Sequence, residues 1–453
     1  MKHSKSTIIL LIIVSLPFYL LSETTTQVTI YNNDLGLVRQ IHNMKIQKGQ
    51  TEIKIEGVSA KVDPTSVKLS FPEKQDKIQI IEQNFLYDLV NSRKIFEKYI
   101  GETIKYHLED GSELSGKILN VEGGDLILKL PNGGIRIASD KKILDYEFPS
   151  LPEGLILKPT LQWLLDSRFQ GQAEAELSYL TSGLQWHAEY VLVLAENEKK
   201  FTLASWVSLI NNSGATYTDA KMKLIAGDIH RVQKERGERI MAFSAAQKTV
   251  APQFEEREFF DYHLYDLQRP VTLKNKEIKQ VALFDELSAS AKKIYKFSGG
   301  HSPVNETPLK VILRIANTKE NQMGLPLPKG VVRIFKKDVD ETLQLIGEDR
   351  IDNTAKNDTF HLEIGKAFDV KGRRIEKNIE KERRSETKSI EIKIYNRKDI
   401  AIYAEVHESM RGDWHIKNAN CKYLKKSNNL LIFPLEIPGG SSKTIEYTYK
   451  RSW

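Results

Sequence analysis

Two short motifs carry the residue types best suited to chemistry. Asp228-Ile-His230 and Asp261-Tyr-His263 each place a carboxylate and an imidazole two positions apart. On a β-strand this spacing puts both side chains on the same face. Two Asp and two His could hold zinc or a harder divalent ion, which would activate water for hydrolysis. The candidate metal ligands are therefore Asp228, His230, Asp261 and His263.

A structural interpretation of the same residues competes with the metal site. His263 is flanked by Phe260, Tyr262 and Tyr265, a setting in which a histidine packs and hydrogen-bonds at a strand edge. The spacing of the two pairs also matches no recognised metal motif. In this second interpretation the protein binds no cofactor, and the sequence identifies no catalytic residue.

The tryptophans also allow two interpretations. Aromatic faces pack on the apolar faces of sugars, so several tryptophans on one surface could form a platform for a saccharide. Packing in a core or between domains is the interpretation that we prefer for most of them. The five positions are Trp163, Trp186, Trp206, Trp414 and Trp453.

The elements that would position these side chains are β-strands. In residues 177–232, apolar side chains recur at every second position, for example at Leu203, Val207 and Leu209. This period predicts strands with one face in a core. A further pattern, a strand that ends in Asn and is followed by a polar turn and another strand, occurs three times, at Asn211, Asn317 and Asn396. Repeated strand pairs of this kind favour stacked immunoglobulin-like sandwiches.

Residues 85–148 differ from this pattern. Apolar residues at nearly helical spacing, without Gly or Pro, predict a helix within 85–101. Four or five short strands follow, and they are separated by Gly-containing pairs that favour tight hairpins. These pairs are Asp110-Gly111, Gly123-Gly124 and Asn132-Gly133-Gly134. The segment is expected to be a small inserted β-barrel of the SH3 or Sm kind.

The expected fold class is all-β, with tandem immunoglobulin-like β-sandwiches and a small SH3/Sm-like barrel insertion. The strand alternation lapses from Gln233 to Glu258, where charge rises, and a long mobile connection is expected there. The predicted blocks are a signal peptide at 1–22, an N-terminal β region at 23–84, the helix and small barrel at 85–148, a β-sandwich at 149–300 with its mobile loop at 233–258, and a C-terminal β-sandwich at 301–453.

The N-terminus has the charge pattern of a secretory signal. Lys2 and Lys5 precede the apolar stretch Ile8–Leu21, which is short for a membrane span of ~20 residues and contains Pro17. An uncleaved anchor is the alternative, but cleavage near 22–26 is the favoured outcome. The expected location is therefore outside the cytoplasm, in the periplasm or associated with the cell envelope, with no transmembrane segment after cleavage.

Charge and cysteine content narrow the classes of function. The net charge is +7, but the Lys and Arg residues are interspersed with Asp and Glu, which argues against a nucleic-acid partner. A single cysteine, Cys421, excludes intramolecular disulfides and cysteine-based zinc sites. We expect Cys421 to be a buried free thiol, and the stability of the protein to come from core burial.

Eight motifs together resemble a bacterial exported family that is called domain of unknown function four-one-three-nine and is in part named for similarity to a mucoidy inhibitor. They occur in the family's order over nearly the whole mature chain. The resemblance implies no reaction, substrate or active-site residue. The motifs are VTIYNNDLGLVRQ, GVSAKVDPTSVKL, LSYLTSGLQWHAEYVLVL, WVSLINNSGATYTDAKMKLIAGDI, FFDYHLYDLQRPVTL, GLPLPKGVVRIFKKD, GKAFDV and YNRKDIAIYAEVHESMRGDWHI.

Two functions of different classes follow from the sequence. The first is an envelope protein without enzymatic activity, whose sandwiches bind another envelope protein or a polysaccharide. The alternative is a metal-dependent hydrolase that acts on an envelope polymer through the two Asp-x-His pairs. The oligomeric state stays open in both.

Overall fold

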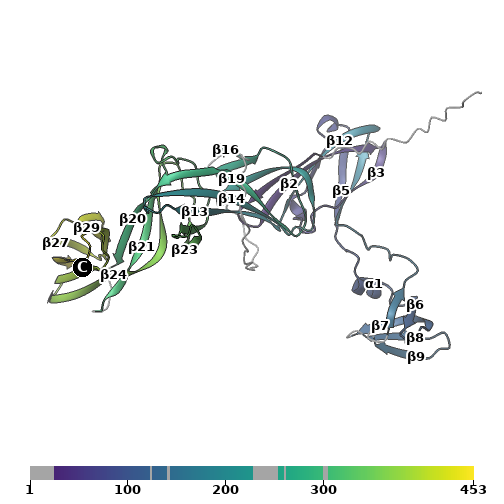
Figure 1. The fold of residues 1–453 in the computed structure, drawn as a ribbon. Coiled ribbons are helices and arrows are strands. Elements are labelled where there is room, and N and C mark those ends of the chain that lie inside the picture. Colours follow the sequence, from purple (N-terminus) through teal and green to yellow (C-terminus); the bar gives the residue numbers. More distant parts are fainter. Residues whose placement is uncertain (1–24, 123–124, 140–142, 228–253, 260–261, 299–304) are drawn as a thin grey trace, which may run out of the picture. The chain divides into compact units, whose positions relative to one another are not determined.

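The computed structural model confirms the all-β prediction (Figure 1). Strands make up most of the part of the chain that it describes, which is 25–122, 125–139, 143–227, 254–259, 262–298 and 305–453. In these ranges the one α-helix, α1, spans Ser92–Lys98, and no helix is long and apolar enough to cross a membrane. Two compact units are present. The first is built around Val38–Leu180, and the second comprises Val28–Leu37 and Thr181–Trp453.

The first unit contains two sheets that each bury one face. In one sheet, β11 pairs antiparallel with both β3 and β5. In the other, β12 lies between β2 and β4. Leu161, Trp163 and Leu165 alternate on β11 and are fully buried, as a period of two requires. On the exposed face of the second sheet, Arg39 Nε lies 2.6 Å from Glu176 Oε1. These strands span β2 Leu35–Ile46, β3 Gly49–Glu56, β4 Lys68–Ser70, β5 Ile78–Leu86, β11 Thr160–Ser167 and β12 Gly171–Thr181.

The predicted insertion is present in the first unit as a sheet with its own core. Its five antiparallel strands have the order β10-β6-β7-β8-β9. Within the described residues β9 and β10 are unpaired edges, so the sheet is open where a barrel would close. The strands are β6 Thr103–Leu108, β7 Glu113–Glu122, β8 Asp125–Lys129, β9 Ile135–Ser139 and β10 Ile143–Glu147, and the core is formed by Ile104, Tyr106, Ile118, Leu126 and Leu128.

The helix in this segment is shorter than the predicted span 85–101. Residues up to Leu86 belong to β5, where Leu86 pairs with Thr160. The helix begins after Asn91, whose side-chain oxygen accepts a hydrogen bond from the Lys94 N–H at 3.0 Å. This cap fixes the start of α1, because Asn satisfies an otherwise unpaired N–H group of the first turn.

The second unit contains a five-stranded sheet of order β19-β14-β13-β22-β23. The predicted alternation on β14 is confirmed, since Leu203, Val207 and Leu209 are buried. A parallel pair, β13 with β22, joins strands that are distant in the sequence. The strands are β13 Leu184–Leu194, β14 Lys200–Asn211, β19 Glu277–Ser290, β22 Gly330–Lys337 and β23 Leu343–Ile351.

The strands on either side of the predicted connection 233–258 pair with one another. In the second unit the strand order is β16-β17-β15-β1, and β18 pairs with β15. Most of 233–258 lies outside the described residues, but from Phe254 onward the chain forms β16. The predicted signal peptide 1–22 also lies outside them. The strands span β1 Thr25–Tyr31, β15 Tyr217–Ala226, β16 Phe254–Phe259, β17 Tyr262–Leu267 and β18 Val271–Leu273.

Nine strands form the C-terminal sheet, in the order β27-β30-β25-β24-β21-β20-β26-β29-β28. Its two edges, β27 and β28, are consecutive in the sequence and joined by residues 420–423 only. Such a connection reaches at most about 18 Å, so the sheet must curl around its core. The strands are β20 Lys292–Ser298, β21 Thr307–Ala316, β24 Thr359–Glu382, β25 Ser385–Asn396, β26 Ile402–Ser409, β27 Asp413–Ala419, β28 Leu424–Ser427, β29 Leu430–Ile437 and β30 Ser442–Ser452.

Cys421 lies in this connection as a free, half-buried thiol that packs against the core. Burial raises the pKa of the Cys421 thiol. The thiol is therefore held in its protonated, weakly nucleophilic form.

The three repeated strand-ending asparagines share one hydrogen-bonding arrangement, which we call the Asn clasp. Asn211, Asn317 and Asn396 are each at most 1% exposed. In each clasp the side-chain oxygen accepts a backbone N–H and the side-chain amide donates to carbonyl oxygens of neighbouring segments. The acceptors are Ala215, Leu273 and Lys274 for Asn211, Leu325 and Ala355 for Asn317, and Ile400, Ile437 and Pro438 for Asn396.

Candidate functional site

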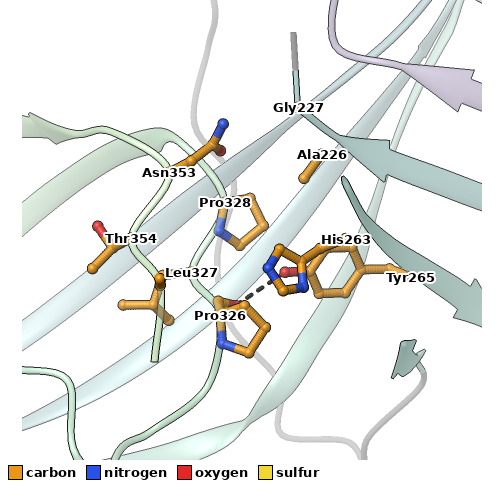
Figure 2. Close-up of a pocket in the computed structure, with 10 residues that line it drawn as sticks. Ala226, Gly227, His263, Tyr265, Pro326, Leu327, Pro328, Asn353 and Thr354 are labelled. Atoms are coloured by element: carbon orange, nitrogen blue, oxygen red, sulfur yellow. Dashed lines mark hydrogen bonds between the residues drawn. The ribbon is translucent and has the colours of Figure 1, made fainter. Parts of the chain in front are cut away.

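Of the four predicted metal ligands, the structure describes His263. It lies on β17 and lines a cavity of about 140 Å³ (Figure 2). Asp228, His230 and Asp261 lie outside the described residues. The other residues that line the cavity are Ala226, Gly227, Tyr265, Pro326, Leu327, Pro328, Asn353, Thr354 and Ala355.

A carboxylate orients the His263 imidazole. His263 Nδ1 lies 2.8 Å from Glu256 Oε1 on the neighbouring strand β16. Lys356 Nζ lies 3.7 Å from the other oxygen of Glu256. Metal-binding histidines commonly hold a carboxylate on the ring nitrogen that faces away from the metal. The same contact also serves a histidine that only packs and hydrogen-bonds, as the structural interpretation expects.

Two tyrosine hydroxyls fix the wall of this cavity. Tyr265 donates to the Pro326 carbonyl at 3.0 Å, and Tyr190 donates to the Pro328 carbonyl at 2.8 Å. Burial raises the pKa of both phenols, so they keep their protons and act as donors. The cavity is smaller than the roughly 300–1,000 Å³ of typical ligand pockets. It can hold water or a small ion but not an organic ligand of ordinary size.

The described residues contain no group of three His, Cys, Asp or Glu side chains that could hold a metal ion. Three of the four predicted ligands lie outside the structure's described ranges, however. The metal site therefore stays a prediction, and its described member, His263, lies beside Glu256.

A second polar site escaped the sequence analysis. His187-x-Glu189 has the same two-residue spacing as the Asp-x-His pairs, so the signal used there could have found it. Glu189 is only 7% exposed. Its Oε2 accepts hydrogen bonds from Gln280 Nε2 at 2.8 Å and Ser208 Oγ at 3.3 Å, and its Oε1 lies 3.5 Å from His187 Nε2. Neutral donors thus anchor a buried carboxylate on the sheet face.

Electrostatics keep Glu189 ionised. The interaction with His187 lowers the pKa of Glu189, and Arg333 and Ser208 act in the same direction. Burial opposes this shift but does not outweigh it. A buried, charged acceptor is thus available at neutral pH, where it can bind hydroxyl or amide donors.

The Glu189 groove, as we call it, lies over β13, β22 and β23. Its volume of about 690 Å³ falls within the usual range for ligand sites, roughly 300–1,000 Å³. Arg333 Nε lies 3.1 Å from Glu348 Oε2 within the groove. The lining residues are His187, Ala188, Glu189, Lys329, Gly330, Val331, Arg333, Glu348, Arg350, Ile351 and Asp352.

Most of the tryptophans are core residues, which agrees with the interpretation preferred from the sequence. Trp163, Trp186 and Trp414 are buried. Trp186 Nε1 donates to the Ile225 carbonyl at 3.2 Å, which satisfies the indole in the core. Trp453 is 64% exposed, and Trp206 on β14 is partly exposed. Within the described residues, these are the two tryptophans whose side chains are not buried.

Fold and site together define an all-β protein of several sheets with a polar groove on one of them. No protein-family model matches the chain, and no curated protein matches it. The family suggested by the eight motifs therefore stays a prediction.

Proposed function

We propose that the protein is an exported, non-enzymatic binding protein of the cell envelope and belongs to the family that its motifs resemble. The observation that carries the binding role is the Glu189 groove, with a buried carboxylate at its floor. Gln280 and Ser208 position this carboxylate by donating hydrogen bonds to it. The signal-like N-terminus supports export.

Affinity capture from intact envelopes tests the binding role. The mature chain and its Glu189→Gln variant serve as baits, and partners are identified by mass spectrometry and glycan analysis. We expect Glu189→Gln to lose the partner. Glu341→Gln is the control, because Glu341 is an exposed carboxylate outside the groove. A partner retained equally by all three baits would contradict binding through the groove.

Export has a separate test. We expect the mature protein to begin between Glu23 and Gln27, since the charged and apolar order of the N-terminus is that of a cleaved signal. N-terminal sequencing of the protein from the envelope fraction measures this. A chain that keeps Met1, or one found only in the cytoplasm, would contradict export and cleavage.

The metal-dependent hydrolase is the second candidate, and the Glu256–His263 contact favours it. A carboxylate on His263 Nδ1 presents Nε2 as a ligand. Metal analysis of the purified mature chain tests this candidate. Stoichiometric zinc or manganese that is lost in both His263→Ala and His230→Ala would support it, and a metal content unchanged by either substitution would exclude these residues as ligands.

A further inference from the structure

Trp206 lies next to the buried carboxylate of the groove. In the antiparallel ladder of β13 and β14, Trp206 is directly opposite Glu189. Directly opposed residues share a face of the sheet, with Cβ atoms about 5 Å apart. On the other side of Glu189, the parallel partner is Val331 of β22. A partly exposed indole, a carboxylate and an apolar side chain thus follow one another across three strands.

The carboxylate has acceptor capacity left for a ligand. An ionised carboxylate offers about four lone-pair sites. Gln280 and Ser208 donate to Oε2, whereas Oε1 has a longer contact, 3.5 Å to His187 Nε2. A ligand hydroxyl that approaches Oε1 would therefore form a charge-assisted hydrogen bond.

The charges that line the groove balance. Three lysine or arginine residues and three acidic residues line it. A buried carboxylate at the floor repels anions, which disfavours phosphorylated or carboxylated ligands at that point. A ligand that combines an apolar face with several hydroxyl groups and no charge fits best. The basic residues are Lys329, Arg333 and Arg350, and the acidic ones are Glu189, Glu348 and Asp352.

We propose that the Glu189 groove binds neutral hexose units of an envelope polysaccharide. One sugar ring stacks on Trp206, which lies beside the groove on β14, and hydroxyl groups of the ligand bond to Glu189 and Arg333. This inference builds on the proposed function and names its ligand class. The indole supplies the apolar surface that stacks on a sugar ring. The groove volume of about 690 Å³ is large enough for a ligand of ordinary size.

Titration of the full mature chain with defined oligosaccharides tests the proposal. The neutral probes are maltohexaose, cellohexaose, laminarihexaose and mannohexaose, and the acidic probe is an oligogalacturonate. Binding is followed by tryptophan fluorescence and isothermal calorimetry. We expect saturable binding of at least one neutral probe, weakened about tenfold or more in Trp206→Ala and in Glu189→Gln.

Trp453→Ala is the matched control, because Trp453 is an exposed tryptophan far along the chain from the groove residues. Its affinity should equal that of the unchanged chain. Thermal unfolding of each variant separates a lost contact from a lost fold, and Trp206→Phe, which keeps an aromatic ring, should bind more tightly than Trp206→Ala.

The outcomes separate this proposal from the broader one. Binding of none of the neutral probes, binding that survives Trp206→Ala, or a preference for oligogalacturonate would overturn the saccharide assignment. If the saccharide assignment fails but Glu189→Gln still loses an identified protein partner in envelope capture, the proposed binding function remains supported. If Glu189→Gln changes neither capture nor sugar binding, both proposals fail.

Discussion

A buried asparagine closes the end of three strands in the second unit. Where the chain turns out of a sheet, some backbone carbonyl groups have no backbone N–H partner among the described residues. In each Asn clasp the asparagine side-chain amide donates hydrogen bonds to such carbonyl groups. Buried carbonyl groups without a donor cost about 1–3 kcal/mol each, so one amide that serves two or three of them is strongly favoured. The sequence analysis found the repeat itself, but the distant carbonyl acceptors became visible only in three dimensions.

Asn396→Asp should destabilise the protein by at least about 2 kcal/mol. The substitution replaces a donor by an acceptor, which then faces the carbonyl oxygens of Ile400, Ile437 and Pro438. Chemical denaturation measures the loss. Asn428→Asp is the control, since Asn428 is exposed. Equal stability of the two variants would show that the clasp contributes little.

Glu198 should make the protein sensitive to acid. Its oxygens lie 2.5 Å from Lys293 Nζ and 2.6 Å from Lys336 Nζ. Burial by itself raises the pKa of Glu198, but the two lysines outweigh burial and lower the pKa from 4.5 to about 2. A lowered carboxylate pKa stabilises the fold above the unfolded-state pKa, and this contribution is lost as pH falls through the folded-state value.

Glu198→Gln should therefore cost about 1–2 kcal/mol at neutral pH, a figure discounted for the partial exposure of the carboxylate. The difference from the unchanged chain should shrink as pH falls from about 4.5 to about 2. Denaturation midpoints over this range measure it. Glu341→Gln, which removes an exposed ion pair with Lys337, should show almost no such difference. A pH-independent gap for Glu198→Gln would contradict the assignment.

At the scale of elements, alternation in the sequence predicted strands well and their partners poorly. The pattern Leu203, Val207, Leu209 identifies the buried face of β14, but nothing in it indicates that β13 pairs in parallel with β22. Local spacing likewise predicted a helix within 85–101 but not its start, because pairing with β11 keeps Leu86 in β5. Non-local pairing decides these points, and local periodicity does not contain it.

In the candidate site, too, local spacing in the sequence did not reveal the contacts that matter. The spacing rule selected Asp261-x-His263 but passed over His187-x-Glu189, although both have one intervening residue. What distinguishes Glu189 is its burial against Gln280 on β19, a contact across 91 positions of the chain. Burial of a charged side chain depends on tertiary packing, so a single sequence does not reveal it.

Gly330→Ala should weaken the parallel pair by about 1–3 kcal/mol. A Cβ at Gly330 would lie 2.2 Å from the Ala188 carbonyl oxygen, so the backbone of β13 or β22 must shift. Thermal unfolding measures the effect. Gly365→Ala is the control, because a Cβ there meets nothing within 4 Å. If both variants unfold at the same temperature, β22 tolerates displacement.

At the scale of the whole molecule, the chain enters and leaves the inserted sheet through two segments that are hydrogen-bonded to each other. Val90 N–H donates to the Ile156 carbonyl and Ile156 N–H donates to the Asp88 carbonyl, both at 3.0 Å. The insertion between them has a separate hydrophobic core. An insertion whose two ends lie close together can be deleted without separating the segments that it connects.

Replacing residues 92–154 by a short Gly-Ser linker should leave a single cooperative unfolding transition in the rest of the chain. The paired ends at Val90 and Ile156 need only a short closure, so the entropic cost is small. Calorimetry and near-UV circular dichroism measure the result. A shortened chain without a cooperative transition would show that the insertion is required for folding.

Strand β30 has a consequence for how the polypeptide is made. It lies between β25 and β27, so it is an interior strand of the nine-stranded sheet although it is the last of the nine to be synthesised. Until residue 452 has left the ribosome, β25 and β27 each present an unpaired edge, and exposed edges of this kind invite pairing with other chains. We therefore expect a nascent chain of this sequence to be prone to aggregation until its C-terminal sheet can close.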